Sequence, residues 1–115
     1  NIQADYQYKA LHSGNLVQRQ WHKNRLILIK EMLRLNKNDS VCDIGCGSGN
    51  AIFAFHQDVK QMDGCDYNRQ CLQFIKKKVE KANLKNIKTF YWNILKPPPK
   101  EMINAYDKVI FTEVI

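Results

Sequence analysis

The sequence lacks an apolar run of about 18 residues, the shortest stretch that crosses a bilayer as a helix. Its N-terminus also lacks the basic start and apolar centre of a secretory signal. Histidine is scarce, and His12, His22 and His56 show no spacing that suits a metal site or a catalytic triad. We therefore predict a protein with no membrane partner and no metal.

Cysteine is present, but not in the paired spacing of a zinc knuckle. The four residues are Cys42, Cys46, Cys65 and Cys71. Their even number leaves a disulfide framework open. However, Cys42 falls in an apolar segment and Cys46 lies among glycines, so we expect reduced, packed thiols and a cytoplasmic protein.

Positive charge is in excess, because 18 Lys and Arg against 11 Asp and Glu give a net charge of +7. The densest basic stretch contains Lys76, Lys77, Lys78 and Lys81, and a nucleic-acid partner would explain it. Four apolar residues recur at helical spacing opposite these lysines: Leu72, Ile75, Val79 and Ala82. This pattern favours the solvated face of an amphipathic helix, and a nucleic-acid partner stays open.

Hydrophobic periodicity predicts alternating helices and strands after an irregular arm over residues 1–20. The expected helices cover residues 21–35, 50–56 and 69–82. The expected strands cover residues 40–44, 60–66, 87–91 and 108–112. Alternation of this kind predicts an α/β domain over residues 21–115, with a parallel sheet and helices on its faces.

Several residues are expected to fix the ends and packing of these helices. Trp21 is predicted to anchor the first helix to the sheet, and Leu28, Met32 and Leu35 to widen its apolar stripe of Leu26, Ile29 and Leu33. Ser48 or Asn50 is expected near the cap of the second helix, and Asn68 at the cap of the third.

A glycine loop follows the first predicted strand, with Gly45, Gly47 and Gly49 at alternate positions. Glycines there let the backbone turn sharply and lie close to a ligand. The dinucleotide fingerprint needs a glycine where Asn50 stands, and no G-K-[ST] follows, as a phosphate loop would require. The loop therefore suits a ligand other than a pyrophosphate.

Two carboxylates flank this loop in the predicted fold. Asp43 stands two positions before the first glycine, where its charge disfavours a phosphate and suits a cation. Asp66 closes the second predicted strand, and its acceptor-only carboxylate can take both hydroxyls of a ribose. A ribose, a positive charge and no phosphate together describe S-adenosylmethionine.

With these motifs the sequence resembles the class I (seven-strand, Rossmann-like) S-adenosylmethionine-dependent methyltransferases. Val41–Gly49 resembles their first motif, Gly64–Tyr67 their acidic second-strand motif, and Tyr106–Phe111 the segment entering their fourth strand. The resemblance covers about residues 20–115. It implies a Rossmann-like parallel sheet flanked by helices and truncated after the fourth strand, which makes residues 21–115 the N-terminal, cofactor-binding part of a methyltransferase domain.

The same resemblance implies contacts with the methionine and ribose portions of S-adenosylmethionine. Gly45, Cys46 and Gly47 would lie along them, mostly through backbone groups, and Gly49 would close the cofactor loop. Asp43 would orient the loop and the methionine amino end. Its alternative role is to cap a neighbouring loop.

At the other end of the cofactor, Asp66 would hold the ribose diol and Tyr67 would pack against the adenine. Asn93 stands where the family usually has Asp, and its carbonyl oxygen would accept a hydrogen bond from the adenine amino group. The N–H of Ile94 would contact the ring. The alternatives are a helix-end carboxylate for Asp66, edge packing for Tyr67 and a turn for Asn93.

Further contacts are less closely defined. Thr112 and Glu113 would approach the methionine end, and Glu113 is the nearest candidate for a general base, although the catalytic residue stays unknown. One of Arg19, Lys23 and Arg25 would reach the cofactor carboxylate, and nothing singles one out.

The implied function is methyl transfer from the cofactor to an acceptor, with a small molecule favoured and RNA or protein left open. A nicotinamide- or nucleotide-binding dehydrogenase-like domain and a non-catalytic binding module of the same fold are the alternatives. The oligomeric state is not predicted. Because the fourth strand would be an unpaired edge or would pair with another chain, we expect the 115-residue chain alone to be poorly soluble or self-associated. We also expect it to be inactive alone.

Overall fold

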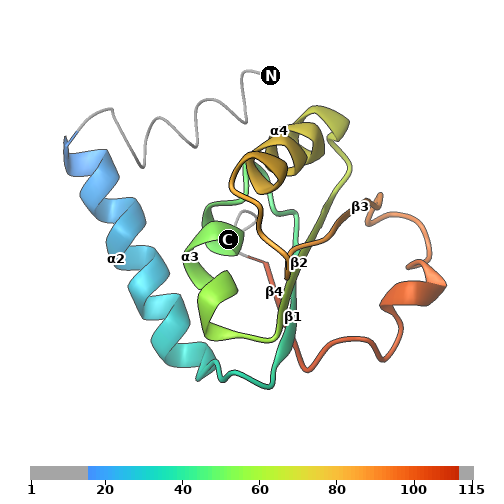
Figure 1. The fold of residues 1–115 in the computed structure, drawn as a ribbon, viewed down its shortest axis with the longest axis horizontal. Helices are drawn as coiled ribbons and strands as arrows, with labels where there is room; N and C mark the ends of the chain where they lie inside the picture. Colours follow the sequence, from blue (N-terminus) through green and yellow to red (C-terminus); the bar gives the residue numbers. More distant parts are fainter. Residues whose placement is uncertain (1–15, 112–115) are drawn as a thin grey trace.

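The fold is a parallel sheet of four strands with helices packed on it, described for residues 16–111 by a computed structural model (Figure 1). The strands are β1 (Ser40–Ile44), β2 (Gln61–Asp66), β3 (Thr89–Tyr91) and β4 (Lys108–Ile110). The helices are α2 (Leu16–Leu33), α3 (Asn50–Phe55) and α4 (Arg69–Lys81), with short 3-10 turns η1 (His56–Asp58) and η2 (Lys100–Met102). The predicted Rossmann-like α/β class is confirmed.

The strand order is β3-β2-β1-β4, and every neighbouring pair is parallel. Asp43 lies opposite Gly64 and Ile44 opposite Cys65, while Asp66 lies opposite Tyr91. The carboxyl ends of β1, β2 and β3 therefore meet at one edge of the sheet, as parallel pairing requires. This edge carries the glycine loop and the end of the acidic strand.

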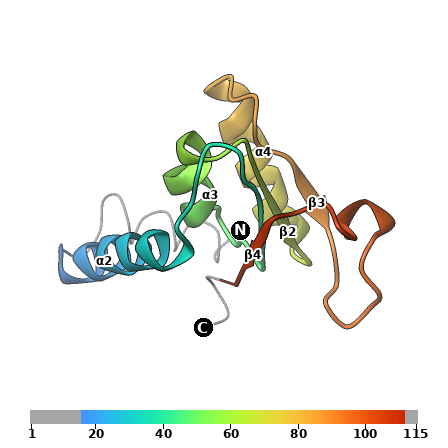
Figure 2. The same cartoon turned by 90° about the horizontal axis from the view of Figure 1, so that it is seen from below.

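The two faces of the sheet are covered differently. On one face, α3 and α4 close the main core around Val41, Ile52, Met62 and Ile75 (Figure 2). On the other face, buried Cys42, Ile44 and Cys65 pack against Phe90, Trp92, Met102 and Tyr106. Three of these residues, Trp92, Met102 and Tyr106, belong to the connection from β3 to β4. This connection has no α-helix and extends to the side of β3 (Figure 1).

Helix α2 begins at Leu16, upstream of the expected start at Trp21, and so crosses the expected boundary between arm and domain. Residues 16–20 contain Leu, Gln and Arg, which favour a helix even though their apolar period is weak. The predicted stripe packs on the core through Leu26, Ile29 and Leu33, and Leu35 packs against the core as well. The predictions for three other side chains are wrong, because Trp21, Leu28 and Met32 are 58%, 56% and 74% exposed.

The caps of α3 and α4 differ in kind. Gly49 caps α3 at φ 88° with no side-chain hydrogen bond, and Ser48 and Asn50, which were expected near the cap, flank it. Asn68 caps α4, and its side-chain oxygen accepts N–H groups from Gln70 and Cys71 at 2.9 and 3.2 Å. This confirms the cap predicted for the third helix.

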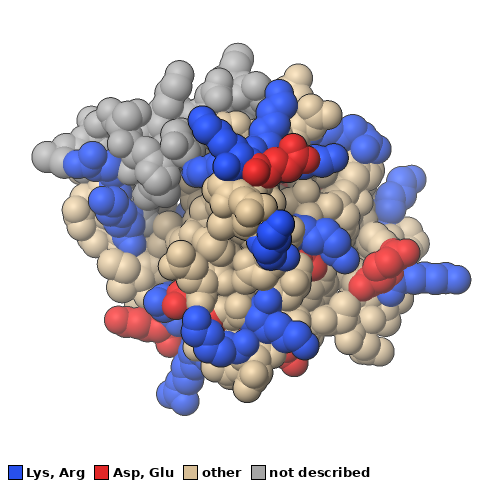
Figure 3. Space-filling model, in the orientation of Figure 1, with Lys and Arg blue, Asp and Glu red and all other residues tan. Residues whose placement is uncertain are grey.

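The lysine-rich side of α4 faces solvent, as expected. Cys71 and Ile75 are buried, whereas Lys76 and Lys77 are exposed. Lys78 is half-buried with its ammonium 4.3 Å from the centre of the Phe53 ring, and Ala82 is exposed rather than packed. Figure 3 shows Lys and Arg side chains spread over this face of the molecule rather than gathered in one patch.

The remaining compositional predictions concern cysteine, metal and membrane. All four cysteines are buried and free, which confirms packed thiols. Between residues 16 and 111, no three His, Cys, Asp or Glu side chains gather as a metal site. No helix in the described part of the chain is both long and apolar enough to cross a membrane.

Candidate functional site

A carboxylate joins the glycine loop to the end of β2. The N–H of Gly47 donates to Oδ2 of Asp66 at 2.9 Å, and the N–H of Asn68 donates to Oδ1 at 2.8 Å. Asp66 is 8% exposed, so these bonds hold it in one orientation at the rim of the sheet. A carboxylate has about four acceptor positions, and two backbone donors leave the others for a ligand.

Three more N–H groups of the glycine loop also bond within the protein. Gly45 and Cys46 both donate to the carbonyl of Cys65, at 2.8 and 3.0 Å, and Gly49 donates to the carbonyl of Cys46 at 3.0 Å. A phosphate-binding loop instead turns its N–H groups outward to the anion. This loop is therefore not built as an anion cradle.

The loop also presents a carbonyl oxygen with acceptor capacity. The thiol of Cys46, a weak donor, lies with its Sγ 3.9 Å from the carbonyl oxygen of Gly47, which keeps a second acceptor position. Oxygen acceptors with a carboxylate nearby suit hydroxyl donors and a positive charge. The arrangement thus favours a ligand that carries hydroxyls and a cation.

Asp43 lies on β1 immediately before the loop and is fully buried. Burial first, and then the charges of Asp43 and Asp66, raise the pKa of the Cys46 thiol well above its usual range. Cys46 is itself fully buried. Its side chain is therefore a neutral packing group and not a nucleophile, which leaves only its backbone for a ligand.

The turn after β3 lies beside Asp66, because the N–H of Trp92 donates to the carbonyl of Asp66 at 3.1 Å. Asn93 forms the turn predicted as its alternative role, since its Oδ1 accepts the N–H of Leu95 at 3.0 Å. That oxygen keeps a second acceptor position. Tyr67 and Ile94 are 70% and 55% exposed, so both stand at the surface near this edge.

The candidate residues for the cofactor carboxylate lie on α2. Nη2 of Arg25 is buried without a hydrogen-bond partner among the described residues, and its guanidinium lies 5.6 Å from the Trp21 ring centre. Arg19 and Lys23 lie on the same helix. Thr112 and Glu113 fall outside the described residues.

The sequence did not reveal a second polar cluster, which lies on the face of the sheet opposite the main helical core. Asp63 is 3% exposed, and the hydroxyl of Tyr106 donates to its Oδ2 at 2.7 Å. Its Oδ1 accepts the N–H of Lys88 at 3.1 Å and Nε2 of Gln61 at 2.6 Å. An Asp inside a predicted buried strand was the available signal, because such a carboxylate must find donors.

The fold and this edge define a Rossmann-like domain of the class I methyltransferase type. A methyltransferase domain family matches residues 35–115, and the chain belongs to this family. A comparison with curated protein sequences gives no match.

Solved structures share the fold. The YcgJ protein from Bacillus subtilis has 20% identity and a TM-score of 0.63 over 68% of this chain and 33% of its own. Coclaurine N-methyltransferase bound to N-methylheliamine and SAH has 21% identity and a TM-score of 0.68 over 85% and 28%. The [4+2]-cyclase SpnF has 18% identity and a TM-score of 0.69 over 80% and 34%. The chain thus spans about a third of the length of these proteins.

Proposed function

We propose that this chain is the cofactor-binding part of an S-adenosylmethionine-dependent methyltransferase whose acceptor is a small molecule. The observation that carries the proposal is the bond from Gly47 N–H to the Asp66 carboxylate, which puts the two predicted motifs in direct contact. RNA and protein acceptors stay outside the proposal because no described residue favours them.

The residues present fit this cofactor better than a nucleotide. Loop N–H groups that bond inward leave no cradle for a pyrophosphate, whereas loop carbonyls can face the methionine ammonium and the sulfonium. The remaining acceptor positions of Asp66 would take the ribose hydroxyls. This pattern disfavours the alternative of a nicotinamide-binding dehydrogenase-like domain.

The adenine would lie against the exposed side chains near the same edge. Tyr67 follows Asp66 directly and offers an exposed ring for stacking. Asn93 would accept the adenine amino group at the second acceptor position of Oδ1, and the N–H of Ile94 would contact the ring. Arg25, with a buried Nη2 that lacks a described partner, is our choice among the α2 residues for the cofactor carboxylate.

When bound, the cofactor supplies a methyl group on a sulfonium, which is already a good leaving group. The residues of this chain then contribute alignment, since an in-line displacement depends on how the donor is held. Asp66 and the loop fix the donor end, while the neutral, buried Cys46 takes no part in covalent chemistry. A general base, where the acceptor needs one, is a role that we leave unassigned, with Glu113 as the candidate nearest in the sequence.

Two further parts of the proposal concern the methyl acceptor and the location of the protein. The small-molecule acceptor is supported by coclaurine N-methyltransferase, which was solved with N-methylheliamine. Four buried, free thiols support a cytoplasmic protein. A second candidate function is another reaction on the same fold, which the [4+2]-cyclase SpnF exemplifies.

The test is calorimetric titration of the intact protein with S-adenosylhomocysteine and, separately, with NAD. We expect micromolar binding of the first and none of the second. Asp66→Ala should weaken binding by at least roughly tenfold, because two ribose hydrogen bonds to a charged acceptor and the anchor of the Gly47 N–H are lost. The matched control is Glu80→Ala, which removes an exposed carboxylate from α4 and should leave binding unchanged.

Three outcomes would contradict the proposal: preferential binding of NAD, equal effects of the two alanine variants, or no binding of either ligand. Methyl transfer from labelled cofactor to a panel of amines, phenols and carboxylates then separates a methyltransferase from a protein of the same fold that runs another reaction. A protein that binds the cofactor and methylates nothing would support the second candidate.

A further inference from the structure

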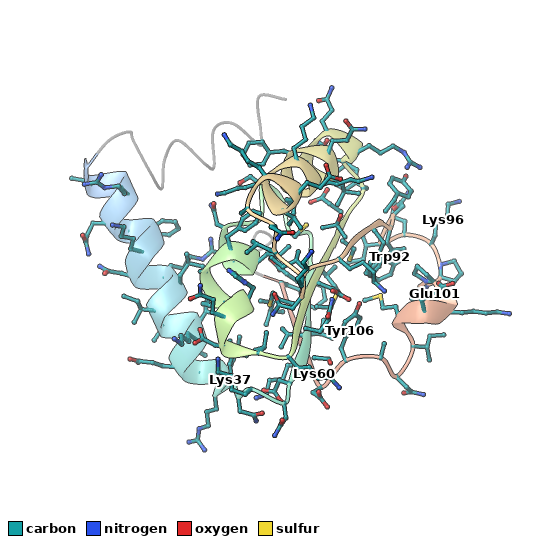
Figure 4. The ribbon with its side chains drawn as sticks, viewed as in Figure 1. Lys37, Lys60, Trp92, Lys96, Glu101 and Tyr106 are labelled. Atoms are coloured by element: carbon teal, nitrogen blue, oxygen red, sulfur yellow. The ribbon has the colours of Figure 1, made fainter. Side chains whose placement is uncertain are left out.

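A cavity lies beside β3 and the connection from β3 to β4, and its lining includes Tyr91, which lies opposite Asp66 in the sheet. It measures about 320 Å³ and is lined by Lys88, Phe90, Tyr91, Pro99, Glu101 and Tyr106. Phe90 and Tyr106 also pack against the buried cluster of Cys42, Ile44 and Cys65, on the face of the sheet opposite the main helical core. Figure 4 shows Trp92, Glu101 and Tyr106 grouped near the connection from β3 to β4. The volume suits a small molecule.

One buried carboxylate fixes two sides of this cavity. Asp63 accepts the Tyr106 hydroxyl at 2.7 Å and the backbone N–H of Lys88 at 3.1 Å. Because the Tyr106 proton is committed to Asp63, the hydroxyl oxygen can only accept a bond from a ligand. The Tyr106 hydroxyl and the backbone of Lys88 are therefore held in place before a ligand binds.

The lining combines aromatic rings with two opposite charges. Phe90, Tyr91 and Tyr106 contribute rings, whose faces attract cations. The guanidinium of Arg69 already lies 4.0 Å from the ring centre of Tyr91, so this ring holds a cation on one face. Glu101 adds a carboxylate to the lining, and Lys88 adds an ammonium.

We propose that this cavity binds a small zwitterion of the betaine type, with a methylated ammonium and a carboxylate. The methyl groups would lie on the rings and on Pro99, while Glu101 neutralises the positive charge. The ligand carboxylate would pair with Lys88. A ligand with only one charge would leave either Lys88 or Glu101 without an opposite charge on the ligand. An uncharged apolar ligand would leave both residues without one.

The first test titrates the intact protein with glycine betaine by calorimetry. Two matched probes accompany it: 3,3-dimethylbutanoate, which has the same shape without the positive charge, and choline, which lacks the carboxylate. We expect saturable binding of betaine and at least roughly fivefold weaker binding of each probe, given the size of cation–π and ion-pair contributions. Absence of saturable betaine binding, or equal binding of 3,3-dimethylbutanoate, overturns the proposal.

The second test uses variants that leave the fold intact. Glu101→Gln and Lys88→Gln each remove a charge from an exposed lining residue and should weaken betaine binding by roughly tenfold. Lys100→Gln, at the exposed neighbour outside the lining, is the control and should have no effect. An equal loss in all three variants overturns the proposal. Titration with S-adenosylhomocysteine should be unchanged in each, which separates this cavity from the cofactor site.

Discussion

At the scale of single residues, Tyr106 shows how one hydroxyl can join distant parts of the chain. It precedes β4 and donates to Asp63 on β2 at 2.7 Å. Tyr106→Phe would leave a buried carboxylate with one donor fewer, at a cost of about 1–3 kcal/mol in unfolding free energy. Urea denaturation measures this cost. Tyr67→Phe, at a tyrosine that is 70% exposed, is the control and should change stability little.

The same hydroxyl gives the protein a sensitivity to alkaline pH. Burial first, and then the bond to Asp63, raise the pKa of Tyr106 above its ordinary value of 10.0. Above pH 10.0 the folded state therefore keeps a proton that the unfolded chain releases. The contribution of this hydroxyl to the free energy of unfolding is complete below pH 10.0 and falls as the pH rises further. Tyr106→Phe should flatten this alkaline decline in denaturation curves. An unchanged slope would show that another group causes it.

The residues that the sequence could reveal are those whose chemistry is local. Asp66 and the glycine loop are recognisable because a strand, its terminal acid and a following turn are contiguous in the chain. The bond between Asp63 and Tyr106 spans two segments far apart, and no local pattern specifies it. Trp21 is 58% exposed, and its local sequence does not distinguish an exposed ring from a packed one.

At the scale of elements, β2 and α3 approach each other because β2 contains a glycine. A Cβ at Gly64 would collide with Cδ1 of Ile52 and lie 3.0 Å from the Cβ and Sγ of Cys46. Gly64→Ala should therefore destabilise the fold by about 1–3 kcal/mol, measured by thermal or urea unfolding. Ile52→Val removes the clashing Cδ1, so the double variant should recover part of the loss. Strict additivity of the two changes would contradict this account.

An ion pair joins the start of β1 to the start of β4. Nζ of Lys108 lies 2.7 Å from Oδ2 of Asp39 and donates to the carbonyl of Arg34 at 2.8 Å. The hydrogen bond from Lys108, and next the N–H of Asn36, hold the pKa of Asp39 below its ordinary value of 3.8. The folded state thus resists protonation more than the unfolded chain does.

For a lowered carboxyl pKa, the contribution to stability is present above the unfolded value and is lost as pH falls. We expect the protein to lose this contribution below about pH 3.8, and Asp39→Asn to show a flatter acid limb in denaturation curves. Asp58→Asn is the matched control, because the pair of Asp58 with Lys30 at 3.0 Å lies on the surface and is worth little. A similar flattening in both variants would assign the effect to net charge.

The ends of helices and strands could be predicted from the sequence where backbone turns determine them. They were harder to predict where side-chain contacts determine them. Strand β1 matches its expected range, since a turn precedes it and glycine follows. Strand β3 begins at Thr89 rather than Ile87, and the N–H of Lys88 bonds to the Asp63 side chain. The positive φ of Gly49 explains why α3 is capped without a side chain, which a search for polar caps overlooks.

At the scale of the whole molecule, ligand binding should appear as added stability. A ligand that binds only the folded state at a hundredfold excess over its Kd adds about 2.7 kcal/mol. S-adenosylhomocysteine should therefore raise the melting temperature of the intact protein in differential scanning fluorimetry, whereas NAD should not. The shift should be lost in Asp66→Ala but kept in Glu80→Ala. An equal shift with NAD would favour the dehydrogenase-like alternative.

The overall architecture followed from the alternation of apolar strands and amphipathic helices, because that pattern is a property of the whole sequence. The course of residues 92–107 did not, since Pro97, Pro98 and Pro99 exclude a regular element without saying where the chain goes. The cavity proposed to bind a zwitterion lies along this connection, with Pro99, Glu101 and Tyr106 in its lining. The part of the molecule with the least regular backbone is thus the part that required a structure.

Asp66 accepts two backbone hydrogen bonds, from Gly47 on one side and from Asn68 on the other. These bonds limit how the protein can be redesigned. An engineer who replaces that carboxylate to change ligand preference also loosens the turn after β1 and the approach to α4. Selectivity is better altered at Tyr67 or Ile94, whose exposed side chains can be exchanged without disturbing the scaffold beneath.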